Sequence, residues 1–170
     1  MRLKNFLRED IVKFYDHDIL PALADAQKLI TRYLNADIVW RGFNSNHSGN
    51  VIKVINSRTS FKGAIDDTVT KILERLHIKA PVFTATSKNK TRLFGDPMVF
   101  IPIGPFTAYS NPKVDDILVA AKTIKDPTDL DNLVTSYKTS TSLGSFMSDH
   151  EVIFDLKEYY LVGIYNLTQR

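Results

Sequence analysis

Asp37-Ile38-Val39-Trp40-Arg41-Gly42 has the composition of a short β-strand that ends in an arginine followed at once by a glycine. Its isoleucine, valine and tryptophan are residues that β-sheets favour. An arginine at the mouth of a strand, next to a residue that lets other groups approach the backbone, suits the capture of a phosphate or a carboxylate. The plainer alternative is that Arg41 is a solvated or ion-paired surface residue. The two alternatives are decided by what lies elsewhere in the chain.

Length and composition bound the class of protein. The chain has 170 residues, which is enough for a single domain with a sizeable core. Its net charge of +3 tolerates an anionic ligand without indicating a nucleic-acid binder. The absence of cysteine excludes disulfides, thiol catalysis and cysteine-held zinc. No apolar run approaches the roughly 18–20 residues that a membrane span needs. The N-terminus also lacks the core of a signal peptide, so we expect a cytoplasmic protein with no membrane partner.

Apolar residues at helical spacing predict several helices. In the first third, Ile11, Val12, Tyr15 and Ile19 could line one helix face, and a second helix is predicted after Pro21. Residues 1–36 are therefore expected to form a helical N-terminal part. Later stripes predict helices over 66–76, 114–121 and 126–137, the first of them beginning at two aspartates that suit a helix N-terminus.

Runs of β-prone residues alternate with these later helices. They predict strands over 51–55, 82–87, 98–105, 106–110, 152–156 and 159–165. Pro102 suggests that its strand lies at an edge or carries a bulge. A basic loop over 88–92 is expected to be solvated rather than bound to nucleic acid, and a loop rich in serine and threonine is expected over 138–148. Helices first, then strands interleaved with helices, indicate a single domain of the α+β class.

Three motifs stand in order along the strands. The first is Arg41-Gly42, the second is Phe83-Thr84-Ala85-Thr86-Ser87, and the third is Asp149-His150-Glu151 followed by Val152-Ile153-Phe154. Their order and wide spacing resemble the ADP-ribosyltransferase family, in its arginine–serine–glutamate branch. In that family the second strand carries an aromatic residue followed by Ser-Thr-Ser, and the third opens with Glu-x-Glu. The resemblance covers roughly residues 37 to 165, although only about a dozen residues carry it.

The resemblance implies a fold and a set of roles. It implies a split β-sheet over residues 37–170 that binds NAD as a substrate and holds no metal. Glu151 would hold the ribose 2′-hydroxyl and stabilise the oxocarbenium-like sugar that forms when nicotinamide leaves. Arg41 would grip the phosphate or the adjacent ribose of NAD, and the Gly42 backbone could hold the nicotinamide amide. Thr86 and Ser87 would brace the nicotinamide ribose. The alternative for Glu151 is a surface acid at the end of a strand.

Two departures from the family pattern affect the expected activity. Ala85 stands where the family has its first serine, unless the register shifts so that Thr84 supplies the hydroxyl. Asp149 stands where the family has the glutamate that orients an acceptor arginine, so the acceptor could be another side chain, a nucleic acid or water. Phe146 lies in the loop that would recognise the target, and its alternative role is simple packing.

A second resemblance concerns the source of the chain. Arg58-Thr59-Ser60, Asp67-Thr68 and the run from Gly95 to Gly104 look like parts of small bacteriophage proteins. The leading expectation is a phage-encoded, NAD-dependent ADP-ribosyltransferase that modifies a host protein or nucleic acid. One alternative is a catalytically inactive relative that acts as a virion or host-protein-binding module. Another is an NAD glycohydrolase. The sequence does not indicate an oligomeric state.

Overall fold

The computed structural model describes residues 10–13, 24–25, 28, 38–43, 51–56, 66–143, 146 and 150–163. Within these residues, nine strands form one sheet. The strands are β1 (Asp10–Lys13), β2 (Trp40–Phe43), β3 (Val51–Ile55), β4 (Pro81–Ala85), β5 (Asp96–Pro102), β6 (Thr107–Ser110), β7 (Lys138–Ser140), β8 (Glu151–Asp155) and β9 (Glu158–Val162). Four α-helices and a 3-10 turn have both ends within the described residues: α2 (Asp67–Arg75), α3 (Lys88–Thr91), η2 (Arg92–Phe94), α4 (Ile117–Ala121) and α5 (Pro127–Ser136).

The sheet is divided between β2 and β4. Its strand order is β1-β3-β9-β5-β2-β4-β8-β6-β7, and every neighbouring pair is antiparallel. Trp40 opposite Ala85 is the one residue pair between β2 and β4, whereas β4 and β8 pair along their whole length. We call β1, β3, β9, β5 and β2 the first half of the sheet, and β4, β8, β6 and β7 the second half.

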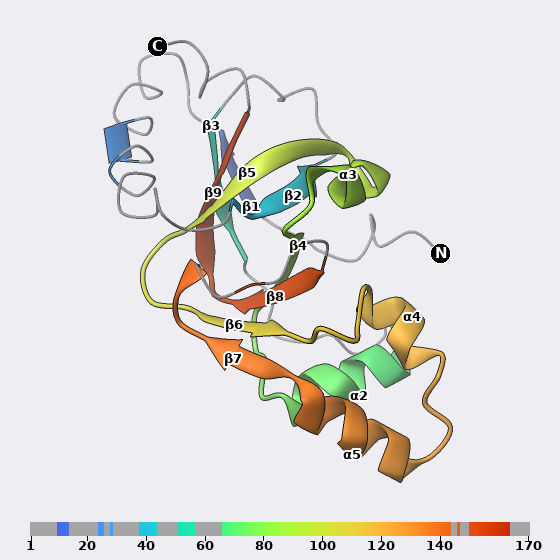
Figure 1. Ribbon diagram of the computed structural model, residues 1–170. Coiled ribbons are helices and arrows are strands. Elements are labelled where there is room, and N and C mark those ends of the chain that lie inside the picture. The colour runs from blue at the N-terminus through green and yellow to red at the C-terminus, as the bar shows by residue number, and fades with distance from the viewer. Residues whose placement is uncertain are drawn as a thin grey trace.

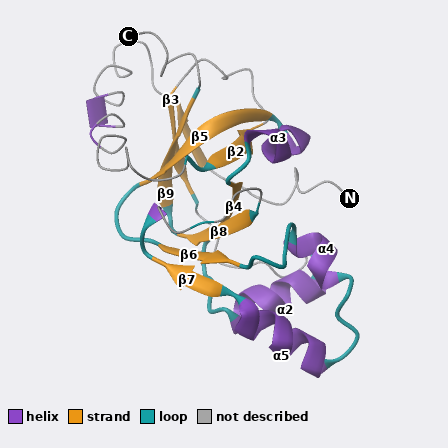
Figure 2. Ribbon diagram, in the orientation of Figure 1, coloured by secondary structure: helices purple, strands orange, loops and turns teal. Residues whose placement is uncertain are grey.

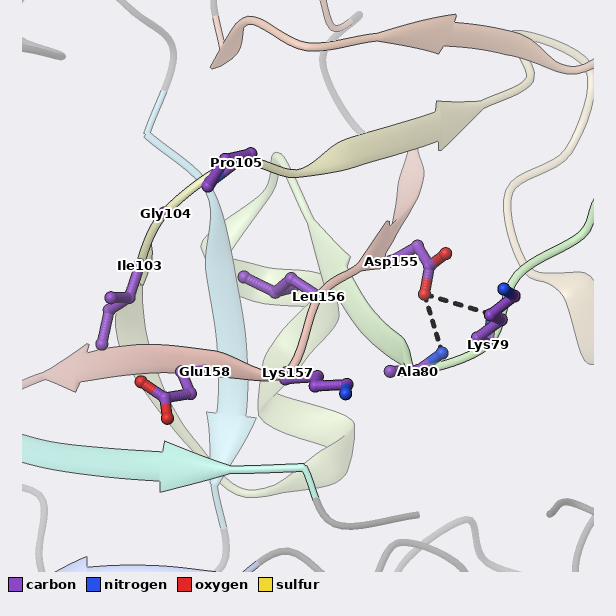
Figure 3. A pocket seen from close by; sticks show the side chains of 9 residues that line it. All are labelled: Lys79, Ala80, Ile103, Gly104, Pro105, Asp155, Leu156, Lys157 and Glu158. Carbon is purple, nitrogen blue, oxygen red and sulfur yellow. Dashed lines mark hydrogen bonds between the residues drawn. The ribbon is translucent and has the colours of Figure 1, made fainter. Parts of the chain in front are cut away.

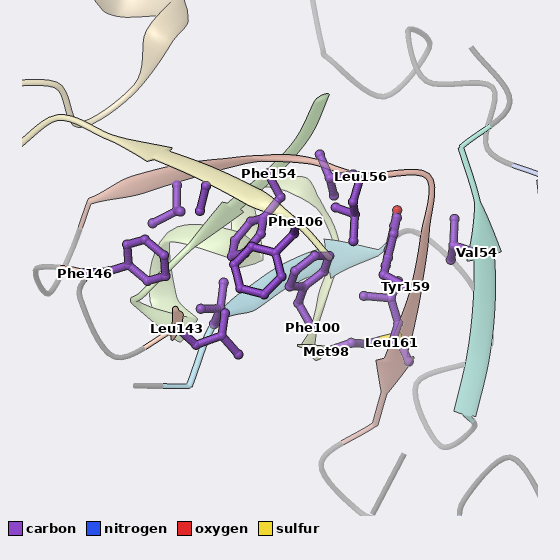
Figure 4. Close-up of a cluster of buried hydrophobic side chains, with 14 of the residues drawn as sticks. Val54, Met98, Phe100, Phe106, Leu143, Phe146, Phe154, Leu156, Tyr159 and Leu161 are labelled. Atoms are coloured by element: carbon purple, nitrogen blue, oxygen red, sulfur yellow. The ribbon is translucent and has the colours of Figure 1, made fainter. Parts of the chain in front are cut away.

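The main core lies where the two halves face each other. The Phe154 ring on β8 lies 4.7 Å, between centroids, from the Phe100 ring on β5, so side chains from both halves meet (Figure 4). Phe106 and Phe146 add further aromatic contacts to Phe154, and Tyr159 on β9 packs on Phe100. Burial of rings of this size is the largest single source of hydrophobic stabilisation available to the fold.

Three helices cover the other face of the second half of the sheet (Figures 1 and 2). Helices α2, α4 and α5 gather beside β6, β7 and β8, and the fully buried Ile72 and Leu73 of α2 pack with Ile153 of β8. Each helix begins at an aspartate whose side chain accepts a hydrogen bond from a backbone N–H of the first turn, a favourable N-cap. These capping residues are Asp66, Asp116 and Asp126.

The structure confirms the mixed class of helices and antiparallel strands, and the helices expected over 66–76, 114–121 and 126–137 are present as α2, α4 and α5. It also corrects three local predictions made from periodicity or composition. Ile11 and Val12 lie in β1, paired with β3, rather than on a helix. Residues 88–92 form α3 and begin η2 rather than an open loop, and residues 138–140 form a strand. Most of the helical part expected over 1–36 lies outside the described residues, although Ala24, Asp25 and Lys28 are helical.

Pro102 does not mark an edge strand, because β5 lies between β9 and β2. It is the last residue of β5, and the pairing with β2 extends only from Asp96 to Val99. Because β2 does not pair with residue 102, the hydrogen bonds between β5 and β2 lose nothing from the missing N–H of Pro102.

Candidate functional site

Glu151 is the first residue of β8, and its carboxyl lies at the start of α4. Oε1 of Glu151 accepts a hydrogen bond of 3.1 Å from the backbone N–H of Ile117. Burial, together with the nearby Asp116 carboxylate, raises the pKa of Glu151 from 4.5 to about 8, although the Ile117 N–H and Lys90 act in the opposite direction. The structure therefore holds Glu151 as a largely protonated carboxyl at neutral pH.

Tyr137 lies close enough to this carboxyl to respond to its charge. Burial, followed by the charges of Glu151 and Asp116, raises the pKa of Tyr137 well above 10. Its buried hydroxyl has no hydrogen-bond partner among the described residues. A protonated carboxyl and a neutral phenol can lie near each other without charge repulsion, so the two raised pKa values are compatible.

Asp115 makes two further polar contacts near the same end of β8. Asp115 pairs with Lys90 at 3.2 Å, and its Oδ1 lies 3.8 Å from Nε2 of His150. These contacts tie α3, the segment before α4 and the start of β8 together. Neither Asp115 nor Asp116 was singled out from the sequence. The signal that could have found Asp116 is its position immediately before a helical stripe.

Arg41 lies in the main core rather than at an open mouth of the sheet. The residue is 8% exposed. Its Nη1 donates a hydrogen bond of 2.8 Å to the carbonyl oxygen of Phe83, and its guanidinium lies 5.7 Å from the centroid of the Tyr159 ring. The cation is therefore held by a strand carbonyl and by an aromatic face.

Register places Arg41 and Glu151 on opposite faces of the sheet. Trp40, Ala85 and Glu151 lie opposite one another across β2, β4 and β8, so their side chains share one face. Arg41 follows Trp40, and successive strand residues point to opposite faces. Arg41 accordingly sits with the core side chain Met98, its partner on β5, whereas Glu151 faces the helices. The structure does not bring these two expected site residues together.

Gly42 is explained by a close contact within the protein. A Cβ at this position would lie 2.2 Å from the backbone oxygen of Thr91 and 2.9 Å from the Cβ of Phe94. The approach to the backbone that the sequence indicated is therefore made by α3 and η2.

The hydroxyl residues after Phe83 divide into two groups. Thr84 is buried, and its hydroxyl donates to the carbonyl of Val152 at 2.8 Å. Thr86 and Ser87 are half-buried and continue the chain beyond β4, on the side of Glu151. The Thr86 N–H donates to the carbonyl of His150, and Ser87 precedes α3 without a side-chain cap. These two residues share an end of the sheet with Glu151.

The last two expected site residues come from the loop before β8. Phe146 is 6% exposed, and its ring makes an edge-on contact with the ring of Phe154. Its position therefore fits a role in core packing rather than in recognition of a target. Asp149, expected to orient an acceptor, lies outside the described residues.

Three further observations bear on the class of protein. Comparison with protein-family models, curated proteins and solved structures gives no significant match in any of the three. Within the described part of the chain, no group of three or more metal-ligating side chains could hold a metal ion. No helix in that part is both long and apolar enough to cross a bilayer. The function must therefore be argued from the site itself.

Proposed function

We propose that this chain is an ADP-ribosyltransferase-like domain that binds a host or virion protein and does not cleave NAD. The observation that carries the proposal is the placement of Arg41 and Glu151. Cleavage of NAD would need the phosphate-gripping arginine and the sugar-stabilising carboxylate in one pocket. Here a sheet separates them, and each is already engaged by the protein's own backbone. A role in the cytoplasm of a bacterial host belongs to the same proposal.

The protonation of Glu151 supports the proposal further. Stabilising an oxocarbenium-like sugar requires a carboxylate. A carboxyl with a pKa of about 8 is mostly neutral at pH 7 and supplies little of that charge. With Ala85 in place of the family's serine, the pattern is that of a catalytic site whose residues have taken structural roles.

The second candidate is an active NAD-dependent ADP-ribosyltransferase. One observation favours it: β2, β4 and β8 are consecutive in the sheet, so the three motifs lie on neighbouring strands, as a shared pocket would require. The pKa of Glu151 is also raised, and titratable groups with shifted pKa values are often found at functional sites. In this candidate the acceptor is a host protein or nucleic acid, or water in the case of a glycohydrolase.

The test incubates the purified chain with labelled NAD and host lysate. We expect no release of nicotinamide above the blank, no label on protein or nucleic acid, and no shift in melting temperature with millimolar NAD. A specific ligand at 100 times its Kd would stabilise the fold by about 2.7 kcal/mol, which a thermal shift resolves.

Glu151→Gln is measured beside the wild type, with Glu158→Gln as the control at a partly exposed carboxylate that is ion-paired with Lys53. Transfer of label that is lost in Glu151→Gln and kept in Glu158→Gln would establish the transferase. Release of nicotinamide without transfer, with the same dependence on Glu151, would establish the glycohydrolase. Either result would overturn the proposal.

A further inference from the structure

An open groove of about 530 Å³ lies at the end of β4 and β8 that is remote from Glu151 (Figure 3). Glu151 opposite Ala85 marks one end of this strand pair, and Asp155 opposite Pro81 marks the other. The groove is bounded by residues 79–80 before β4, by the turn over 103–105, and by the β8–β9 turn. Leu156 lies between the two sides (Figure 3).

The walls of the groove are fixed by backbone hydrogen bonds. The N–H of Leu156 donates to the carbonyl of Ala80 at 3.2 Å, and the N–H of Ile103 donates to the carbonyl of Glu158 at 3.1 Å. An apolar strip runs through the groove, formed by the exposed Pro105, the half-buried Ile103 and the small exposed parts of Leu156 and Ala80. Preformed, mostly apolar concave surfaces with a few polar groups are what ligand sites have in common.

The charges around the strip leave an excess of one positive charge, because Lys53, Lys79 and Lys157 surround two carboxylates, Asp155 and Glu158. Oδ1 of Asp155 accepts hydrogen bonds from the backbone N–H groups of Lys79 and Ala80, at 3.1 and 2.7 Å. Glu158 pairs with Lys53 at 3.2 Å. The exposed Lys79 and Lys157 have no carboxylate partner within the described part of the chain. Two cationic groups are therefore left to meet an incoming ligand.

We propose that this groove binds an acidic, extended segment of a partner protein. Carboxylates of the segment would meet Lys79 and Lys157, and an apolar side chain would lie over Leu156. A nucleic acid is disfavoured because two lysines beside an apolar strip do not form the extended positive surface that a phosphate backbone follows, whereas a segment with both acidic and apolar side chains can use both features. The inference rests on the proposed function, for which it names the surface and the chemistry of the partner.

The test uses a fluorescein-labelled decapeptide of alternating glutamate and leucine, with anisotropy measured on the full chain. We expect saturable binding that weakens about tenfold or more in the double variant Lys79→Glu with Lys157→Glu, because attraction becomes repulsion at both positions. The matched control is Lys122→Glu with Lys125→Glu, which makes the same change in net charge at exposed positions outside the groove. The control is expected to bind as the wild type does.

Two further probes examine the chemistry of the partner. Replacing leucine by serine in the peptide should weaken binding, since the apolar strip would lose its contact, and a lysine–leucine peptide should not bind. The proposal is overturned by no binding up to about 1 mM peptide, by equal losses in the two double variants, or by groove-dependent binding of a single-stranded oligonucleotide in place of the peptide.

The same preparations are assayed for NAD cleavage, which keeps the two proposals apart. Cleavage of NAD would overturn the proposed function whatever the peptide does. Failure of the peptide without NAD cleavage would overturn the groove alone.

Discussion

Gly42 shows at the residue scale how a motif residue can serve packing. Adding a methyl group here would force Thr91 and η2 away from β2, because the Thr91 oxygen is a backbone atom that no side-chain rotation can remove. We predict that Gly42→Ala lowers the free energy of unfolding by about 2–3 kcal/mol, as overpacked cores do. Urea denaturation measures this change.

Gly104→Ala is the control for the Gly42 prediction. A Cβ at Gly104 meets nothing within 4 Å, but its φ of +76° disfavours a side chain. Its cost should therefore be only about 1 kcal/mol, from backbone strain alone. If Gly42→Ala were no worse than Gly104→Ala, the contact of α3 with β2 would be adjustable, and the packing explanation of this glycine would fail.

The same residue shows what a single position in the sequence can reveal. A glycine after Arg41 indicated that another group approaches the backbone at this position, and the backbone oxygen of Thr91 does so. The sequence could not say whether the approaching group was a ligand or Thr91, because that contact joins segments about fifty residues apart in the chain. Arg41 is similar, since its partner carbonyl belongs to Phe83 on another strand.

At the scale of elements, α4 is held to β8 by the hydrogen bond between Glu151 and Ile117. The unfolded chain releases the Glu151 proton near its ordinary pKa of 4.5, whereas the folded protein, in which this pKa is about 8, keeps the proton over the window between these two values. Stability therefore falls as pH rises through this window, by at most about 1.4 kcal/mol per pH unit from this group. Glu151→Gln keeps the acceptor oxygen and removes the titration.

We predict that Glu151→Gln matches the wild type near pH 5 and is the more stable protein near pH 8. Chemical denaturation at several pH values measures the difference, in which the titration of other groups cancels to first order. Glu158→Gln, at a partly exposed ion pair with Lys53, should follow the wild-type profile. Parallel profiles for Glu151→Gln and the wild type would show that Glu151 is already ionised in the folded protein.

Elements with local signals were predictable, and elements made by distant pairing were not. Helices α2, α4 and α5 carry their own caps and apolar stripes, so the sequence located them. Strands β1 and β7 exist because they pair with β3 and β6, which no local pattern reports. The separation of Arg41 from Glu151 also depends on register, because a shift of one residue would turn every side chain of a strand to the other face.

At the scale of the whole molecule, one aromatic cluster joins the two halves of the sheet. Phe154 on the second half contacts Phe100 on the first half, while β2 and β4 share one residue pair. The core, rather than the backbone ladder, must therefore couple the halves. We predict that Phe154→Ala costs about 3–5 kcal/mol, and that the milder Phe154→Leu costs less.

Coupling through this cluster also predicts a single unfolding transition, as one domain over 1–170 requires. Trp40, the only tryptophan, reports on the first half by fluorescence, and far-UV circular dichroism reports on the helices that cover the second half. The two urea transitions should coincide in the wild type and in Phe154→Leu, and the exposed Val119→Ala should change the midpoint little. If the fluorescence and dichroism midpoints separated in the wild type, the halves would unfold independently. The ladder between β2 and β4 would then be a domain boundary rather than a division within one fold.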